Sequence, residues 1–195
     1  MAFNIDQFKV NGLQYGGARP ALFQVAVSPP PAIGLDLTST RKFEFTARTA
    51  TLPEMTVGSV EIPYFGRKIK IAGDRTFNDW SVTVMNDEDF GVRAMFEKWS
   101  NAINRMVTNT RQADIIIENY KAAVDVIQYS KDGSIIRSYQ IVGAFPTAVE
   151  AISLDWDTTN QVETFTVGFA YDYWVPQVEV SGKIAGGINQ YSGNI

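Results

Sequence analysis

The chain has no cysteine and no histidine among its 195 residues. The absence of cysteine excludes disulfide bonds, thiol catalysis and cysteine-ligated zinc or iron–sulfur sites. The absence of histidine removes the commonest general base and transition-metal ligand, so serine–histidine–aspartate and cysteine–histidine catalytic groups are impossible. Catalysis by carboxylates, lysine or tyrosine remains open, but we predict no catalytic residue, no cofactor and no metal site.

Charged residues and long apolar runs are also scarce. Asp, Glu, Lys and Arg make up only 19% of the chain, and the formal net charge is −4. Tight binding to a phosphate backbone normally needs clustered Lys and Arg, so this balance disfavours specific binding of nucleic acid. No apolar run approaches the ~20 residues that span a bilayer, and residues 1–12 lack the basic start and apolar block of a signal peptide. We expect a protein made in a cytoplasm, without a membrane partner.

Motifs for binding phosphate and calcium are missing as well. Gly12, Gly16 and Gly17 match neither the phosphate loop G-x-x-x-x-G-K-[ST] nor the dinucleotide pattern G-x-G-x-x-G. The acids at residues 87–89 do not have the spacing of an EF-hand loop. We interpret them as the capped start of a helix, where acids complement the positive end of the helix dipole.

Aromatic and hydrophobic residues, by contrast, are plentiful. Hydrophobic residues make up 45% of the chain and aromatic residues 12%, which is typical of a folded globular protein and not of a disordered chain. The length fits one well-buried domain. We divide the chain into an N-terminal arm (residues 1–19), a β domain (20–176) and a C-terminal tail (177–195), because both ends are rich in glycine and polar residues.

Alternation of apolar and polar side chains predicts that most of the domain is β-strand. The alternation in residues 42–49 places Phe43, Phe45 and Ala47 on one face, and a loop opened by three prolines precedes them over residues 29–40. The full set of expected strands covers residues 21–28, 42–49, 56–62, 68–72, 80–85, 123–130, 134–142, 147–156 and 163–174.

Two hairpins are expected among these strands. The Asp-Gly pair at residues 132–133 lies between two alternating runs, which is a strong signal for a tight turn. Pro63 and Gly66 separate the strands of a second, longer hairpin over residues 56–72.

One amphipathic helix is expected over residues 87–106. Its apolar side chains recur at three- and four-residue steps, namely Val92, Met95, Phe96, Trp99, Ile103 and Met106. Many strands with one packed helix indicate a mainly β (α+β) fold of the sandwich or barrel class.

The densest basic cluster consists of Arg67, Lys68, Lys70 and Arg75. Nucleic-acid binding is one interpretation of this cluster. We favour a charged hairpin that meets an acidic neighbour, because no aromatic residue is spaced for base stacking.

Asp155 and Asp157 flank Trp156 and would share one side of a strand, as in a glycosidase-like acid pair. We favour solvated acids at the end of a strand. The four tryptophans are interpreted as anchors of the core or of an interface, namely Trp80, Trp99, Trp156 and Trp174.

Several long segments resemble the tail tube proteins of contractile-tailed, T4-like bacteriophages. They are GGARPALF (residues 16–23), PYFGRKIKIAGDRTF (63–77), WSVTVMND (80–87), F-x-x-R-x-x-F-E-x-W-x-x-x-I-N (90–104), VGAFPTAVEAISLDW (142–156) and FTVGFAYDYW (165–174). The order and spacing of these motifs extend over residues 16–174.

The resemblance implies a structural virion protein, not an enzyme. Such a subunit has a sandwich or barrel fold and forms six-fold rings, which stack into a hollow tube inside a contractile sheath. The expected partners are other copies of the chain, the sheath, the baseplate and the tail terminator. The tube would conduct double-stranded DNA without binding it specifically, and the acidic balance predicts a lumen of neutral or like charge. Assembly would take place in the host cytoplasm.

We further expect the long hairpin to make ring contacts, because it is too long and too charged to pack fully on its own domain. The candidate residues are Pro63, Tyr64, Phe65, Gly66, Arg67, Lys68 and Lys70.

Three other functions remain as alternatives. The same fold would serve as the tube of a DNA-free injection machine, such as a tailocin. A monomeric β-sandwich that binds carbohydrate or a receptor is a second alternative, and an enzyme that relies on carboxylates is a third.

Overall fold

The computed structural model describes residues 5–13, 15–111 and 116–177. The helices are α1 (Ile5–Asn11), α2 (Leu37–Thr46), α3 (Gly91–Ile103) and α4 (Ile117–Tyr120), with a single 3-10 turn, η1 (Pro31–Ile33). The strands are β1 (Phe23–Ser28), β2 (Ala47–Ala50), β3 (Thr56–Tyr64), β4 (Arg67–Thr76), β5 (Trp80–Met85), β6 (Ala122–Tyr129), β7 (Ile135–Val149), β8 (Thr164–Ala170) and β9 (Tyr173–Gln177).

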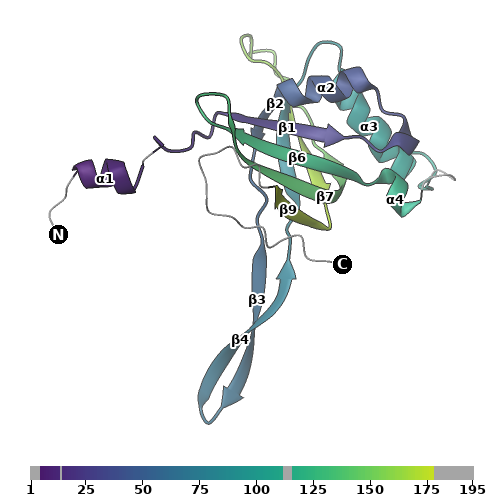
Figure 1. The fold of residues 1–195 in the computed structure, drawn as a ribbon. Helices are drawn as coiled ribbons and strands as arrows, with labels where there is room; N and C mark the ends of the chain where they lie inside the picture. The colour runs from purple at the N-terminus through teal and green to yellow at the C-terminus, as the bar shows by residue number, and fades with distance from the viewer. Residues whose placement is uncertain (1–4, 14, 112–115, 178–195) are drawn as a thin grey trace.

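Seven strands form one antiparallel sheet in the order β1-β6-β7-β8-β5-β2, with β9 paired to β7. The long strand β7 belongs to two ladders. Its first part pairs with β6 and β9, and its last part, from Phe145, pairs with β8. Helices α2 and α3 lie side by side at one end of this sheet, and the two-stranded sheet β3–β4 extends from the opposite end (Figure 1).

The core forms where α3 packs on the sheet. The α3 side chains of Val92, Met95, Phe96 and Trp99 are buried. Phe96 makes edge-to-face ring contacts with Phe43 of α2 at 5.3 Å and with Phe169 of β8 at 5.8 Å, an arrangement favoured by the ring quadrupoles. The mainly β fold with a packed helix is therefore confirmed.

The strand predicted over residues 42–49 is wrong, because most of this segment belongs to helix α2. Asp36 caps the helix, since its carboxylate accepts a hydrogen bond of 2.9 Å from the Ser39 backbone N–H. Phe43 is fully buried while Phe45 is 80% exposed, so the two rings do not share a face. Strand β2 begins only at Ala47, and the predicted loop over residues 29–40 is shortened accordingly.

The helix predicted over residues 87–106 exists but is shorter. It begins at Gly91, after Phe90 in the left-handed region (φ 52°), and no acid lies in its first turn. The capping role predicted for the acids survives only in Asp89, whose carboxylate accepts a hydrogen bond from the Gly91 N–H at 3.0 Å. Met106 lies beyond the helix and is exposed.

The end of the domain also differs from the prediction. Residues 147–156 do not form a separate strand, because β7 continues through Pro146 to Val149 with an irregular register there. The last predicted strand is two strands, β8 and β9. The predicted irregular arm contains α1, which has no buried residue and lies apart from the sheet (Figure 1). The other predicted strands and both hairpins are confirmed, with β5 matching residues 80–85.

Candidate assembly surface

The hairpin of β3 and β4 is the element with the least contact to its own domain. All nine residues of β3 and all but one of β4 are exposed, and Figure 1 shows the two strands as a twisted ribbon away from the sheet. A two-stranded hairpin without other packing is marginally stable in water. The hairpin therefore depends on a partner that covers it, or on strong pairing within itself.

The tip of the hairpin is a two-residue turn. Phe65 and Gly66 join Tyr64 to Arg67, and both have positive φ angles, 42° and 80°. Positive φ at both central residues is the mark of the type I′ turn, which fits the twist of paired strands. The Phe65 ring is 89% exposed and packs edge-to-face on Tyr64 at 4.6 Å.

The register of the hairpin separates its side chains into two faces. Val60 pairs with Ile71 and Ile62 with Ile69, while Tyr64 pairs with Arg67. Because directly paired residues share a face and alternate along each strand, one face carries four aliphatic side chains and a tyrosine. We call it the apolar face, and its members are Val60, Ile62, Tyr64, Arg67, Ile69 and Ile71.

The opposite face of the hairpin is polar. Glu61 pairs with Lys70 there, and Pro63 pairs with Lys68. The Lys68 Nζ lies 2.7 Å from the Glu61 carboxylate and the Lys70 Nζ lies 3.8 Å from it. These exposed ion pairs add little stability. The alternation of side chains along β4 places both lysines on the side away from the apolar face.

The aliphatic side chains of the apolar face are about half exposed, from 46% for Ile62 to 54% for Val60. Contiguous exposed apolar surface marks sites of protein interaction, because leaving it in water is unfavourable. Salt-linked lysines on one side and aliphatic residues on the other suit a ribbon with one face against protein and one toward water.

Comparison with known proteins identifies the family. The model for the phage tail tube protein family matches residues 18–177. The chain belongs to the phage tail tube protein family. It is 37% identical to the tail tube protein gp19 of Enterobacteria phage T4 over 161 residues, which cover 80% of this chain and 90% of gp19. As a member of this family it is a structural protein of the phage virion.

Two cryo-EM structures of contractile machines contain chains with a similar fold. One is the anti-feeding prophage baseplate, with a TM-score of 0.61, 11% identity and coverage of 83% of this chain and 95% of that one. The other is the sheath–tube complex of PVC, an extracellular contractile injection system, with a TM-score of 0.57, 14% identity and coverage of 91% and 100%. These similarities confirm the tail tube fold.

The structure places all of the predicted ring-contact residues of this tail tube chain on the hairpin. Pro63, Lys68 and Lys70 lie on its polar face, Tyr64 and Arg67 on its apolar face, and Phe65 and Gly66 form the turn. Sequence reasoning missed the aliphatic members of the apolar face, which are Val60, Ile62, Ile69 and Ile71. The alternation V-E-I and I-K-I on either side of the turn could have indicated them.

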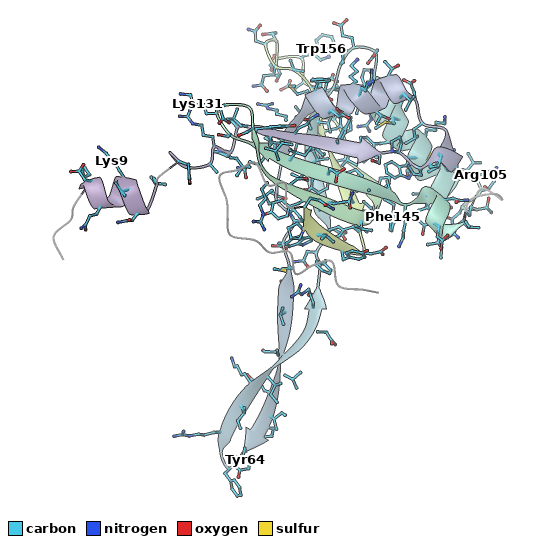
Figure 2. All side chains as sticks on the ribbon, in the orientation of Figure 1. Lys9, Tyr64, Arg105, Lys131, Phe145 and Trp156 are labelled. Carbon is cyan, nitrogen blue, oxygen red and sulfur yellow. The ribbon has the colours of Figure 1, made fainter. Side chains whose placement is uncertain are left out.

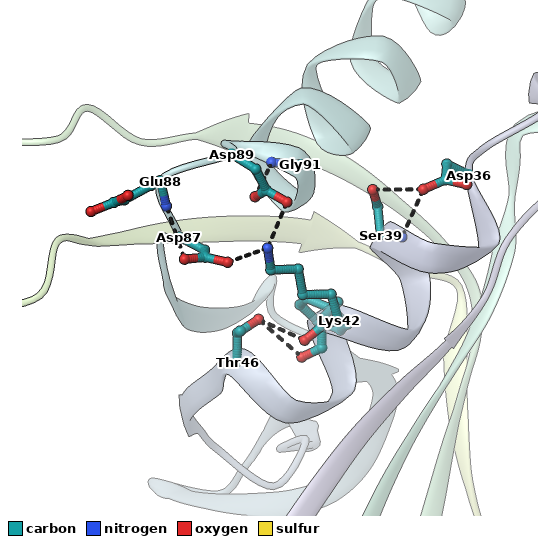
Figure 3. A network of polar contacts seen from close by, with 9 residues as sticks. Asp36, Ser39, Lys42, Thr46, Asp87, Glu88, Asp89 and Gly91 are labelled. Atoms are coloured by element: carbon teal, nitrogen blue, oxygen red, sulfur yellow. Dashed lines mark hydrogen bonds and ion pairs between the residues drawn. The ribbon is translucent and has the colours of Figure 1, made fainter.

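The acids at residues 87–89 surround a lysine in the structure. Figure 3 shows the Lys42 Nζ of α2 between the carboxylates of Asp87 and Asp89, with an N–O distance of 2.7 Å to Asp89. Hydrogen bonds from Lys42 lower the pKa values of both aspartates, and those to Asp87 and Asp89 raise the pKa of Lys42. Glu88 points away from the lysine (Figure 3). The network ties α2 to the start of α3.

Asp155 and Asp157 lie in the loop between β7 and β8, not on a strand. The Asp155 carboxylate accepts hydrogen bonds from the Asp157 N–H at 3.1 Å and the Thr158 Oγ at 3.3 Å, so it shapes a turn. Trp156 between them is 99% exposed, whereas Trp80 and Trp99 are in the core as expected. The exposure of Trp156 excludes the core role for this residue and leaves the interface role as a prediction.

Two searches bear on other kinds of site in residues 5–13, 15–111 and 116–177. No group of three or more Asp or Glu side chains there could hold a metal ion. No helix within the same described ranges is long and apolar enough to cross a membrane.

Proposed function

We propose that this chain forms six-fold rings that stack into the inner tube of a contractile phage tail, and that DNA passes through this tube during ejection. Family membership identifies the chain as a tail tube protein, and the proposal adds how its copies assemble. The observation that carries it is the hairpin, whose apolar face is left uncovered within the described residues.

The sheet provides open edges for the closure of a ring. Among the described strands, β1, β2 and β9 each pair with one strand only. Unpaired strand edges promote aggregation of a monomer. A heterologous contact between edges that closes after six copies would remove this hazard, and stacking of the rings would give the filament.

We assign the two ends of the chain to contacts outside the ring body. In this proposal residues 20–176 form the body, and residues 1–19 and 177–195 extend from it. Helix α1 supports this division, because Ile5, Phe8 and Val10 are exposed on a helix with no buried residue. The C-terminal tail lies beyond the described residues, apart from Gln177.

The proposed partners of the tube are the sheath, the baseplate and the tail terminator. Similar folds in a baseplate and in a sheath–tube complex support these partners. The net charge of −4 supports passage of DNA without specific binding, because a neutral or acidic wall does not hold phosphates. An electropositive inner wall in an assembled tube would contradict this part. We propose no catalytic role, and we place assembly in the host cytoplasm.

A tube of a DNA-free injection machine is the second candidate. The fold similarity to the anti-feeding prophage and PVC chains favours it. Particles purified from the producing host would decide between the two: DNA-filled capsids on the tails indicate a phage, and tails without capsids indicate the DNA-free machine.

The first experiment is negative-stain electron microscopy of the purified chain, with mass measured on the same preparation. Six-fold rings or hollow tubes are expected, formed either spontaneously or after addition of purified baseplates. Monomers under both conditions would overturn the proposal.

A pair of variants tests the role of the hairpin. Ile62→Asn with Ile69→Asn makes the apolar face polar and should abolish tubes. Ser59→Asn with Ala72→Asn, at a directly paired and exposed position on the opposite face, is the matched control and should leave them intact. Normal polymerisation after replacement of residues 63–68 by an Asn-Gly turn would refute the ring-contact role of the hairpin.

A further inference from the structure

We infer that the apolar face of the hairpin binds the Trp156 loop (residues 151–163) of a second copy, and that this contact joins copies head to tail along the tube. The inference rests on the proposed function and names the surface that receives the hairpin.

The Trp156 loop presents apolar side chains to solvent. Trp156, Leu154 and Val162 are 99%, 79% and 64% exposed. The Asp155 carboxylate fixes the turn by accepting two hydrogen bonds, and the Thr158 N–H donates to the Asp155 carbonyl at 3.4 Å. The indole is thus held outward before any partner binds. Tryptophan in such a position is the residue type most often found to dominate binding energy at interfaces.

The hairpin and the loop lie at opposite ends of the molecule. Figure 2 shows Tyr64 at the tip of the hairpin and Trp156 at the far side of the sheet. One chain therefore does not bring the two surfaces together, and a contact between them joins two copies. Since each copy has one hairpin at one end and one loop at the other, the contact repeats in one direction and builds a filament.

The charges of the two surfaces are complementary. The hairpin carries Arg67, Lys68, Lys70 and Arg75 against Glu61 and Asp74, an excess of positive charge. The loop carries three acids, Asp155, Asp157 and Glu163, and no basic residue. Complementary charge steers association and fixes register. Together with two uncovered apolar surfaces, it favours a second copy as the occupant.

The natural absence of cysteine provides a clean test by disulfide trapping. Ile62→Cys places a thiol on the apolar face, and Trp156→Cys places one on the loop. A disulfide needs Cα atoms about 4.4–6.8 Å apart, so mild oxidation of assembled tubes should link the double variant into a ladder of dimers, trimers and longer chains. Ile69→Cys offers a second hairpin position. Pro63→Cys, which neighbours Ile62 but faces the other way, is the matched control and should give no ladder.

A second test uses tube formation as its readout. Trp156→Ala should raise the concentration needed for tubes about tenfold or more, as removal of a tryptophan anchor does at other interfaces. Trp156→Phe should retain most of the assembly. Because the indole is exposed, neither change should alter the circular dichroism or the melting of the monomer.

The outcomes separate this inference from the proposed function. Tubes that form but give no ladder with either hairpin position overturn the inference and leave the proposed function intact. A ladder from Ile62→Cys with Phe8→Cys but not with Trp156→Cys assigns the apolar face to the N-terminal helix of a neighbour, which also overturns it. A wild-type chain that stays monomeric even after addition of baseplates would overturn both the inference and the proposed function.

Discussion

Gly143→Ala tests how the long strand β7 passes from one ladder to the other. Gly143 has a φ angle of 71°, in the left-handed region that costs an L-residue about 1–2 kcal/mol. It lies at an irregularity of register, because Val124 pairs with Ile141 and Ala122 with Ala144. From Phe145 onward, β7 pairs with β8. The bend of β7 is therefore built on a residue without a Cβ.

The space beside Gly143 adds a second cost. A Cβ at this position would overlap Oδ2 of Asp172 and lie 2.8 Å from its Cγ. Asp172 must rotate away, and it then loses the two hydrogen bonds of 2.7 Å that Lys121 Nζ donates to its carboxylate. An exposed ion pair of this kind contributes about 0.2–1 kcal/mol. Gly143→Ala should thus lower the free energy of unfolding by about 1–3 kcal/mol.

Gly133→Ala is the matched control. Gly133 also has a positive φ angle, 83°, but nothing lies within 4 Å of the position of an added Cβ. Only the backbone cost of about 1–2 kcal/mol applies there. Urea unfolding and calorimetry of the monomer measure both changes, and for a chain of this size 1 kcal/mol shifts Tm by about 2–4 °C.

A double variant isolates the clash. Asp172→Ala removes the carboxylate, so Gly143→Ala with Asp172→Ala should cost less than the sum of the two single changes. Equal losses for Gly143→Ala and Gly133→Ala, with strict additivity in the double variant, would refute the assigned contact between Gly143 and Asp172.

Two further predictions concern the helices. Phe96→Ala should destabilise the monomer by about 3–5 kcal/mol, because it empties a fully buried ring site; a loss below 1 kcal/mol in urea unfolding would show that the core collapses around the gap. The pKa values of Asp87 and Asp89 are lowered from 3.8, so their contribution with Lys42 is present above that pH and is lost as pH falls through the lowered values. Lys42→Met should therefore lower Tm at pH 7, and this effect should shrink as pH falls below 3.8, in melts recorded from pH 7 downward; an effect that does not change with pH would contradict the ion-pair explanation.

The sequence predicted the strands in which burial alternates cleanly. Strand β5 has buried Trp80, Val82 and Val84 on one face, which is the period of two that the alternation indicated. The hairpin of β6 and β7 followed from its Asp-Gly turn, where Gly133 has a positive φ angle. In these places local pattern and tertiary packing agree.

The sequence failed where tertiary packing overrode a local pattern. Phe43 and Phe45 alternate with polar residues as in a strand, but the cap at Asp36 starts a helix that places only Phe43 against Phe96. In that helix the two buried residues, Thr40 and Phe43, lie three positions apart, which is a helical spacing. Local sequence pattern alone did not decide between the strand period of two and the helical period of 3.6 residues.

The sequence analysis chose the hairpin as an assembly surface because it is long and charged. The exposed apolar face is stronger support for that role. Residues 60–62 and 69–71 alternate in the same way as strands with a buried face, and this pattern predicts that some protein covers the aliphatic side. In the monomer that cover is missing among the described residues, since Ile62 and Ile69 are about half exposed. An alternating pattern typical of a buried face, on a hairpin whose aliphatic side chains are about half exposed in one chain, indicates that a second chain buries them, as the proposed tube requires.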